Sequence, residues 1–140
     1  MLKPPLTATL TWDHALEFTG EIGKHEVGMD GASYSAPSPM QLLALSLAGC
    51  MAIDIVHILT RGRHALAGIS TALVAERAPE EPHRFTRIDL RFTVTTSASA
   101  EQVQRALDLS REKYCSVWNS LRQDIEFTTS FELKEAEPQG

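Results

Sequence analysis

The chain has 140 residues, a formal net charge of −5 and a pI near 5.5. A chain of this length is expected to form a single domain over residues 1–140, with a core large enough to be stable without disulfide bonds. The acidic balance and the lack of a basic patch argue against nucleic acid or a membrane surface as a partner. The N-terminus has no charged leader followed by a long apolar run, so a cytoplasmic location is expected.

The first part of the chain is predicted to form a small antiparallel meander. Apolar and polar residues alternate over Leu6–Trp12, as is typical of a half-buried strand. The segment Ala15–Thr19 can pair back on this strand as a hairpin, and His25–Val27 is a third short strand before a turn at 28–31. A polar loop over 32–37 then leads to the next element.

A long helix over Ser38–Arg63 is predicted to be the centre of the fold. Ser38 and Gln41 have the spacing of a capping box, and Gly62 with its flanking arginines suits a helix end. Apolar residues occupy most faces of this helix, so we expect protein to surround it on nearly every side. Asp54 and His57 inside the segment argue against a transmembrane span.

One stripe of this helix carries chemically active side chains. At about 100° per residue, five positions lie within roughly 40° of Cys50: Leu43, Ser46, Asp54, His57 and Arg61. In the simplest interpretation, Cys50 is a small core residue and the charged members of the stripe pair among themselves. The functional interpretation is that the stripe holds a reactive thiol.

Two strands are predicted after the long helix. Ile69–Glu76 has strand character, and the proline-rich segment Ala78–Pro82 is expected to be a loop. The clearest alternation in the chain follows, with Ile88, Leu90, Phe92 and Val94 pointing to the core and Arg87, Asp89, Arg91 and Thr93 to water. The charged face of this strand is expected to be a solvated surface.

The last part of the chain is predicted to add a second helix, a short third helix and a final strand. Ser99 and Gln102 again have capping-box spacing, and Cys115 lies at the end of the helix that they begin. Ser116–Leu121 is interpreted as the short helix and Ile125–Leu133 as the strand. The fold class is therefore α+β, with sheets around a helical centre and a core that a second copy completes.

The chain has two cysteines, Cys50 and Cys115, 65 positions apart. In a reducing compartment, such a pair is better interpreted as transient or catalytic than as a structural bridge. Peroxide reduction by a cysteine needs a thiolate, a nearby positive charge or donor, and commonly a second thiol. Cys115 lies next to a predicted helix start, where backbone amides favour a thiolate. We find no HExxH, paired CxxC, GxSxG, phosphate-loop or GxGxxG motif, so neither a metal nor a cofactor is expected.

Three motifs carry a resemblance to a known family: HEVGMDG at 25–31, SPMQLL at 38–43 followed by AGC at 48–50, and KYCSVWNSL at 113–121. Together they resemble the OsmC/Ohr family of osmotically induced proteins and organic hydroperoxide reductases. The resemblance implies an OsmC-like fold, an intertwined homodimer whose two long helices are enclosed by antiparallel β-sheets. It places the active site near the subunit interface.

The resemblance also implies a chemistry. In the peroxidase branch, the first cysteine attacks a fatty or aryl hydroperoxide and the second forms a disulfide with it. A dithiol, in some members a lipoyl-bearing protein, then reduces that disulfide. By motif, Cys50 would be the peroxidatic and Cys115 the resolving cysteine, with no metal and no bound cofactor.

The sequence departs from the peroxidase branch at two places. That branch has a glutamate ten residues before the first cysteine, where this chain has Met40 followed by Gln41. It also has an arginine in its N-terminal strands, whereas no arginine precedes Arg61 here. Asp54 looks like the aspartate of a less characterised OsmC-like branch, and its charge would raise the pKa of the Cys50 thiol.

Supporting residues for the thiol are therefore sought elsewhere. Gln41, Asp54 and His57 are the candidates for a supporting role in the site. Lys24, His57 and Arg61 are candidate cations, and each also has a simpler interpretation: a solvated surface lysine, a core histidine and a helix-end arginine, respectively.

Three functional hypotheses follow from the sequence. The first is thiol-dependent reduction of organic hydroperoxides in oxidative stress defence, with a small organic hydroperoxide and a dithiol reductant as partners. The second is an OsmC-like protein without peroxidase activity that binds a small lipophilic or sulfur-containing ligand at the dimer interface. The third is a purely structural or interaction protein in which neither cysteine has a role.

Overall fold

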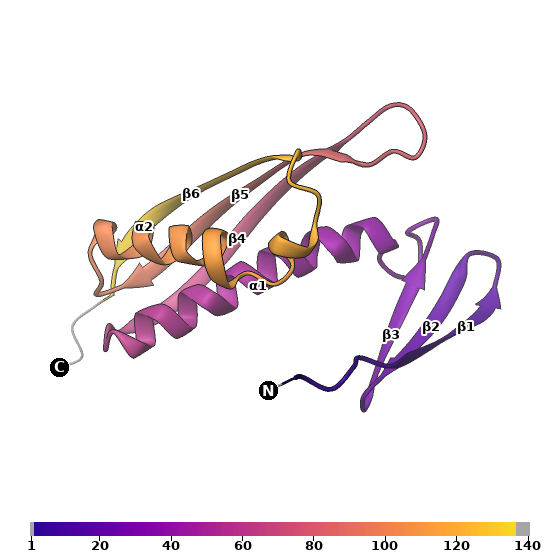
Figure 1. Ribbon diagram of the computed structural model, residues 1–140, viewed down its shortest axis with the longest axis horizontal. Helices are drawn as coiled ribbons and strands as arrows, with labels where there is room; N and C mark the ends of the chain where they lie inside the picture. Colours follow the sequence, from indigo (N-terminus) through magenta and orange to yellow (C-terminus); the bar gives the residue numbers. More distant parts are fainter. Residues whose placement is uncertain (1, 137–140) are drawn as a thin grey trace. The chain divides into compact units, whose positions relative to one another are not determined.

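The computed structural model describes residues 2–136 of the chain. The chain divides into two compact units, one up to Leu43 and one from Ala44 onward. Figure 1 labels the elements in chain order: β1 (Ala8–His14), β2 (Glu17–Ile22), β3 (His25–Asp30), α1 (Pro39–Arg61), β4 (Leu66–Arg77), β5 (Phe85–Thr96), α2 (Ala100–Leu109), η1 (Ser110–Tyr114), η2 (Trp118–Ser120) and β6 (Glu126–Glu135). The α+β class predicted from the sequence is confirmed.

The first unit is built on an antiparallel meander, as predicted, with strand order β1-β2-β3. The pairing of β2 with β3 is regular from Glu17 opposite Asp30 to Ile22 opposite His25. The pairing of β1 with β2 shifts between Trp12 and His14. The third strand is longer than predicted, since it continues through the expected turn to Asp30.

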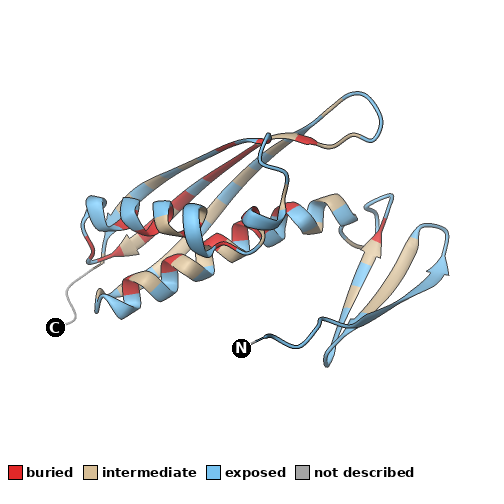
Figure 2. Ribbon diagram, viewed as in Figure 1, coloured by how far each residue is buried: buried red, intermediate tan, exposed pale blue. Residues whose placement is uncertain are grey.

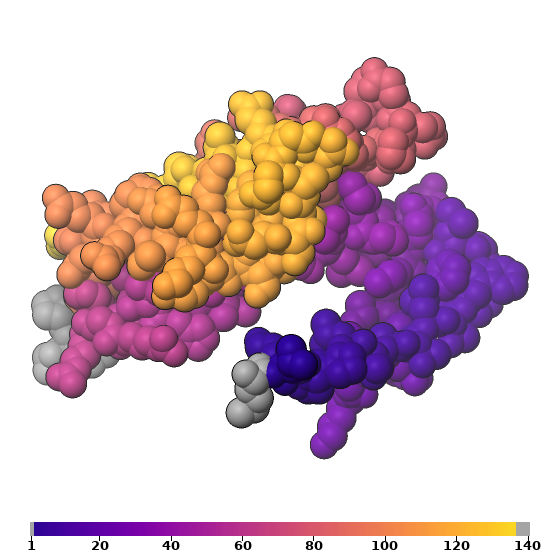
Figure 3. Space-filling model, viewed as in Figure 1, coloured from indigo at the N-terminus to yellow at the C-terminus, as the bar shows by residue number. Residues whose placement is uncertain are grey.

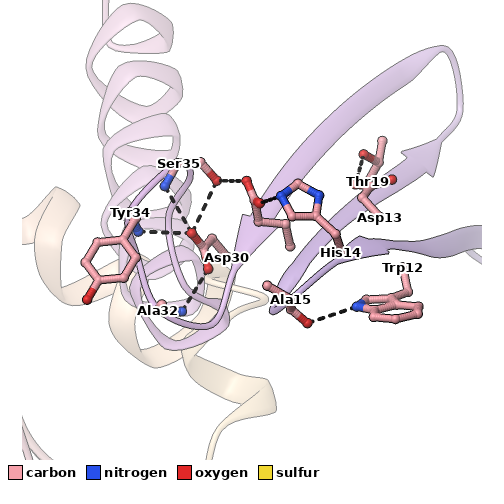
Figure 4. Close-up of polar contacts among 10 residues, drawn as sticks. Trp12, Asp13, His14, Ala15, Thr19, Asp30, Ala32, Tyr34 and Ser35 are labelled. Carbon is pink, nitrogen blue, oxygen red and sulfur yellow. Dashed lines mark hydrogen bonds and ion pairs between the residues drawn. The ribbon is translucent and has the colours of Figure 1, made fainter.

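The loop between β3 and α1 is organised by the Asp30 carboxylate (Figure 4). Its oxygens accept the backbone N–H groups of Ala32 at 2.9 Å, Tyr34 at 3.1 Å and Ser35 at 3.0 Å. These bonds, led by that from the Ser35 backbone, lower the pKa of the Asp30 carboxyl because they stabilise its charged form. The loop closes where Asp30 N–H donates to the Pro37 carbonyl at 3.1 Å, so the carboxylate fixes the chain's approach to α1.

The first unit has almost no core of its own. Asp30 is the only residue among positions 2–43 that is buried, and Leu10, Trp12 and Leu16 each expose more than half of their surface. The ribbon of the meander in Figure 2 is accordingly pale blue and tan along nearly its whole length. Three strands with no covered apolar face are not stable alone in water, so this unit requires other protein against it.

The predicted start of the long helix is confirmed. Gln41 N–H donates to Ser38 Oγ at 3.2 Å, and Ser38 N–H donates to Gln41 Oε1 at 2.9 Å. These two bonds satisfy two of the free donors at the helix start. At the other end, Arg63 rather than Gly62 takes the left-handed conformation, with φ of 62°.

The expectation that protein surrounds α1 on nearly every side is wrong for a single chain. One face is buried: Ala44, Leu47, Ala48, Met51, Ile55 and Leu59. The opposite side leaves Leu45 64% and Ile53 58% exposed. By length and composition α1 also meets the criteria for a membrane-spanning helix, criteria that the core helix of a soluble protein meets as well. One sheet and one short helix are simply too little to cover both sides of α1.

The second unit packs its helices against a three-stranded sheet of order β4-β5-β6. β4 pairs antiparallel and β6 parallel with the central strand β5. The inward residues predicted for β5 are all buried. The ribbon in Figure 2 is red at intervals along β5 and along one side of α1. The core of this unit contains these residues of β5, α1 and α2: Ile88, Leu90, Phe92, Val94, Leu47, Met51, Ile55, Leu59, Val103, Ala106 and Leu107.

The predicted water-facing side of β5 needs one correction. Asp89 is buried, not solvated. Its carboxylate accepts the hydroxyl of Thr128 at 2.6 Å and the Arg91 Nε–H at 3.0 Å. The Thr128 hydroxyl is the main reason why the pKa of Asp89 is lowered. Pairing of β6 alongside β5 supplies this partner and shields the carboxylate.

The second helix and the segment after it match the prediction in part. Ser99 and Gln102 form the expected capping box, with bonds of 3.2 and 2.8 Å. The helix then widens into the π-helical turn η1, and Cys115 follows it in an extended conformation. The short third helix predicted over Ser116–Leu121 is reduced to the 3-10 turn η2, which Val117 precedes without a side-chain cap.

Candidate functional site

The structure brings the two cysteines together from distant parts of the sequence of the second unit. Cys50 lies half-buried on α1, and Cys115 lies completely buried after the π-helical turn; both are free thiols. α2 and the segment that follows it, in orange, cover one side of the magenta α1 in Figure 3. The Cys50 thiol lies close enough to Cys115 to raise the pKa of the Cys115 thiol, so the two thiols are neighbours.

Burial raises the pKa of the Cys115 thiol to about 11, because the thiolate would lose its hydration. The Trp118 N–H donates to Cys115 Sγ at 3.4 Å and opposes this rise. The neighbouring Cys50 thiol and the charge of Asp54 raise the pKa further. The amide donation that we predicted at Cys115 is therefore present, but desolvation outweighs it and keeps Cys115 protonated.

Asp54 is held by a residue that the sequence analysis did not select. The hydroxyl of Ser110 donates to Asp54 Oδ2 at 2.7 Å, and Ser110 is completely buried. The same residue accepts the Cys115 N–H on its carbonyl at 2.6 Å. The available signal was a serine on the apolar face of an amphipathic helix, where a buried hydroxyl needs a partner.

The predicted pairing of Asp54 with His57 and Arg61 is wrong. Within residues 2–136, neither His57 nor Arg61 forms an ion pair, and Asp54 is bonded to Ser110 instead. The stripe of α1 does line a cavity of about 360 Å³ together with the end of α2 and the π-helical turn: Asp54, His57, Ile58, Arg61, Leu109 and Tyr114. His57 and Arg61 are thus the basic side chains that reach this cavity.

The other predicted supporting residues lie in the first unit. Gln41 uses its side-chain oxygen within that unit, where it accepts the Ser38 N–H and the Ser33 hydroxyl, the latter at 2.7 Å. Lys24 lies in the turn between β2 and β3. Among the described residues, no group of three His, Cys, Asp or Glu side chains is arranged to hold a metal ion. The arrangement around the two thiols is thus a sulfur pair with a carboxylate and a hydroxyl beside it.

The fold and this sulfur pair define a class of protein, and comparison with known proteins gives the family. The family model described as OsmC-like protein matches residues 30–130. The protein YhfA of Escherichia coli is 41% identical over 131 residues, which cover 91% of this chain and 98% of YhfA. The chain belongs to the OsmC-like protein family, as the sequence motifs predicted. Members of this family are typically homodimers.

Solved structures show the same fold. A hypothetical protein of Aquifex aeolicus superposes with a TM-score of 0.89 at 24% identity, covering 96% of this chain and 100% of that one. An organic hydroperoxide resistance protein OsmC of Legionella pneumophila has a TM-score of 0.72 at 16% identity, covering 94% and 99%. At these identities the likeness concerns the fold alone.

Proposed function

We propose that the protein reduces small organic hydroperoxides with electrons from a dithiol. The observation that carries this proposal is the proximity of Cys50 to Cys115, 65 positions away in the sequence, through which Cys50 raises the pKa of the Cys115 thiol. A pair that meets in space without being joined by a disulfide is the arrangement that a thiol peroxidase needs. The family likeness supports it, since other proteins of this fold are described as organic hydroperoxide resistance proteins.

The accessibility of the two thiols supports the proposed roles of Cys50 as peroxidatic and Cys115 as resolving cysteine. Cys50 is half-buried, so a substrate can reach it, whereas Cys115 is completely buried. In the first step, the Cys50 thiolate attacks the terminal oxygen of the hydroperoxide, the O–O bond breaks, and the alcohol leaves with a proton. In the second step, Cys115 displaces hydroxide from the Cys50 sulfenic acid, and the disulfide and water form.

A dithiol closes the cycle by exchange, because it restores both thiols and leaves as its own disulfide. We therefore propose that the reaction takes place in a reducing compartment such as the cytoplasm, where such a dithiol stays reduced. The cation that would favour the Cys50 thiolate is proposed to be His57 or Arg61, the basic side chains of the neighbouring cavity.

The test is a peroxidase assay with cumene hydroperoxide and dithiothreitol. We expect the wild-type protein to consume the peroxide and Cys50→Ser to lose nearly all of this activity. Cys115→Ser should accumulate a sulfenic acid at Cys50, which dimedone labels and mass spectrometry detects. Failure of the wild-type protein to consume peroxide above the dithiothreitol background would reject the proposal.

A second candidate function is the binding of a small lipophilic or sulfur-containing ligand without peroxidase chemistry. The raised pKa of Cys115 favours it, because a protonated thiol suits an uncharged ligand, and the cavity of about 360 Å³ offers the apolar side chains of Ile58, Leu109 and Tyr114 beside its charged ones. It predicts that mild peroxide leaves both thiols free. Thiol counting after exposure to peroxide separates the two functions.

We also propose an intertwined homodimer as the form in which the protein acts, with residues 1–140 as one domain completed by its partner. The first unit has no apolar core, and α1 leaves Leu45 and Ile53 exposed. The outer strands of both sheets, β1, β3, β4 and β6, pair on one side only. Exchange of units between two copies would cover these surfaces together.

A further inference from the structure

Ser110 bonds to both halves of the thiol site. Its hydroxyl donates to Asp54 Oδ2 at 2.7 Å, and Asp54 lies one helical turn after Cys50 on α1. Its carbonyl accepts the Cys115 N–H at 2.6 Å, which closes the π-helical turn. A single buried residue therefore connects the helix that holds Cys50 with the backbone of Cys115.

The connection has the right place to control disulfide formation. Disulfide formation requires the two sulfur atoms to approach to about 2 Å. The Cα and Cβ atoms of both cysteines must therefore lie within narrow distance limits. The segment after α2 reaches α1 through a π-helical turn, an irregular form that is common at functional sites. A charge-assisted hydrogen bond from that turn to α1 fixes the position of the turn along the helix.

We propose that Asp54 and Ser110 form a positioning bridge that holds Cys115 in reach of Cys50 for disulfide closure. This inference rests on the proposed function for its biological meaning. In the closing step, the S–O bond of the Cys50 sulfenic acid breaks as the S–S bond forms. The Cys115 thiol is oxidised, the sulfenic sulfur is reduced, and the thiol proton leaves with the hydroxyl group as water.

Four variants separate the bridge from its surroundings. Ser110→Ala and Asp54→Ala each remove one partner of the hydrogen bond. Asp54→Asn is the conservative variant, since its amide oxygen still accepts the Ser110 hydroxyl. Ser116→Ala is the matched control, a serine beside Cys115 that is exposed and makes no side-chain hydrogen bond among the described residues.

The experiment follows both chemical steps after a pulse of cumene hydroperoxide, with dimedone labelling for the sulfenic acid and mass spectrometry for the disulfide. We expect Ser110→Ala to form the sulfenic acid at the wild-type rate. Once the sulfenic acid has formed, Ser110→Ala and Asp54→Ala should each close the disulfide at least roughly tenfold more slowly than the wild type. Asp54→Asn should close within about twofold of wild type, and Ser116→Ala should match it. Circular dichroism verifies that each variant is folded.

Two results would overturn the bridge: closure at the wild-type rate in both alanine variants, or equal slowing in Asp54→Asn. A failure of the proposed function looks different, because no sulfenic acid would form in the wild type. In that case, diamide, which oxidises thiol pairs without peroxide, replaces the pulse. The same order of closure rates is then expected, and equal rates in all five proteins would reject the bridge.

Discussion

At the scale of single residues, the two thiols differ in what surrounds them. Cys115 is enclosed by protein, beside the negative charge of Asp54, and a single N–H donates to its sulfur. Desolvation therefore dominates, and the thiol form is favoured. In the resolving role, Cys115 must therefore give up its proton as its sulfur attacks the Cys50 sulfenic acid, and this proton leaves with the hydroxyl group as water.

The raised pKa predicts a pH dependence of stability. The pKa of Cys115 is raised from 9.0 to about 11 in the folded protein, so the folded state holds this proton more tightly than the unfolded chain. The resulting stability is fully present below about pH 9 and is lost as the pH rises to about 11. Urea unfolding of the reduced protein across this range should show the wild type losing stability relative to Cys115→Ser.

The control for this measurement is Cys50→Ser, which keeps the buried Cys115 and should lose stability over the same range as the wild type. A stability difference between wild type and Cys115→Ser that stays constant from about pH 8 to about pH 11 would contradict the shift.

The residue contacts that could be predicted from sequence are the local ones. Both capping boxes are confirmed, because Ser38 with Gln41 and Ser99 with Gln102 lie three positions apart. The partners of the buried carboxylates could not be predicted, since Ser110 is 56 positions from Asp54 and Thr128 is 39 from Asp89. Such contacts depend on how elements pack, which the spacing within one element does not contain.

At the scale of elements, the sequence predicts burial best where the apolar residues lie on one face of an element and that face alone meets the core. The alternation in β5 gives the right buried set because one face of this strand meets the core. The α1 segment was harder to interpret, because its apolar residues cover nearly the whole circumference while a single chain buries one side. The π-helical turn after α2 carried no sequence signal that we recognised.

The capping box of α2 gives a prediction at this scale. Replacing Ser99 by Ala removes the acceptor of the Gln102 N–H and should lower the free energy of unfolding by about 1 kcal/mol. α2 leads into the π-helical turn that precedes Cys115. The loss of the cap should therefore also increase amide hydrogen exchange in the last residues of α2, just before that turn. Chemical denaturation and amide exchange measure the two effects.

Ser120→Ala serves as the matched control for the cap, since Ser120 is exposed and its side chain makes no hydrogen bond within residues 2–136. We expect its unfolding free energy to equal that of the wild type within error. A Ser99→Ala protein as stable as this control would show that the box contributes nothing to α2.

At the scale of the whole molecule, the meander and one side of α1 both expose apolar side chains. The meander has no buried apolar residue of its own, and α1 presents an apolar side with Leu45, Ile53 and Val56 exposed. An apolar surface of this kind on a single chain marks an interface. The same residues explain why α1 has the length and composition of a membrane helix. One apolar side of the helix packs on the core of its own chain, and the other apolar side is left for a partner.

Ile53 is the position where this argument can be tested most directly. It is 58% exposed on the uncovered side of α1, so Ile53→Glu leaves the core of the chain intact. In a two-fold symmetric dimer each copy contributes the same face, and the carboxylate enters the interface twice. Burying an unpaired charge costs several kcal/mol, so we expect the dimer to dissociate at least roughly a hundredfold more readily.

Sedimentation equilibrium of wild type, Ile53→Glu and Gln104→Glu measures this difference, because Gln104→Glu adds the same charge on the exposed side of α2. We expect the wild type and Gln104→Glu to remain dimers at micromolar concentration and Ile53→Glu to be largely monomeric. The peroxidase activity of Ile53→Glu should fall with its dimer fraction and recover as the protein concentration is raised, if the proposed dimer is the active form. A monomeric wild type, or dimers of equal affinity in all three proteins, would show that the apolar side of α1 has another partner.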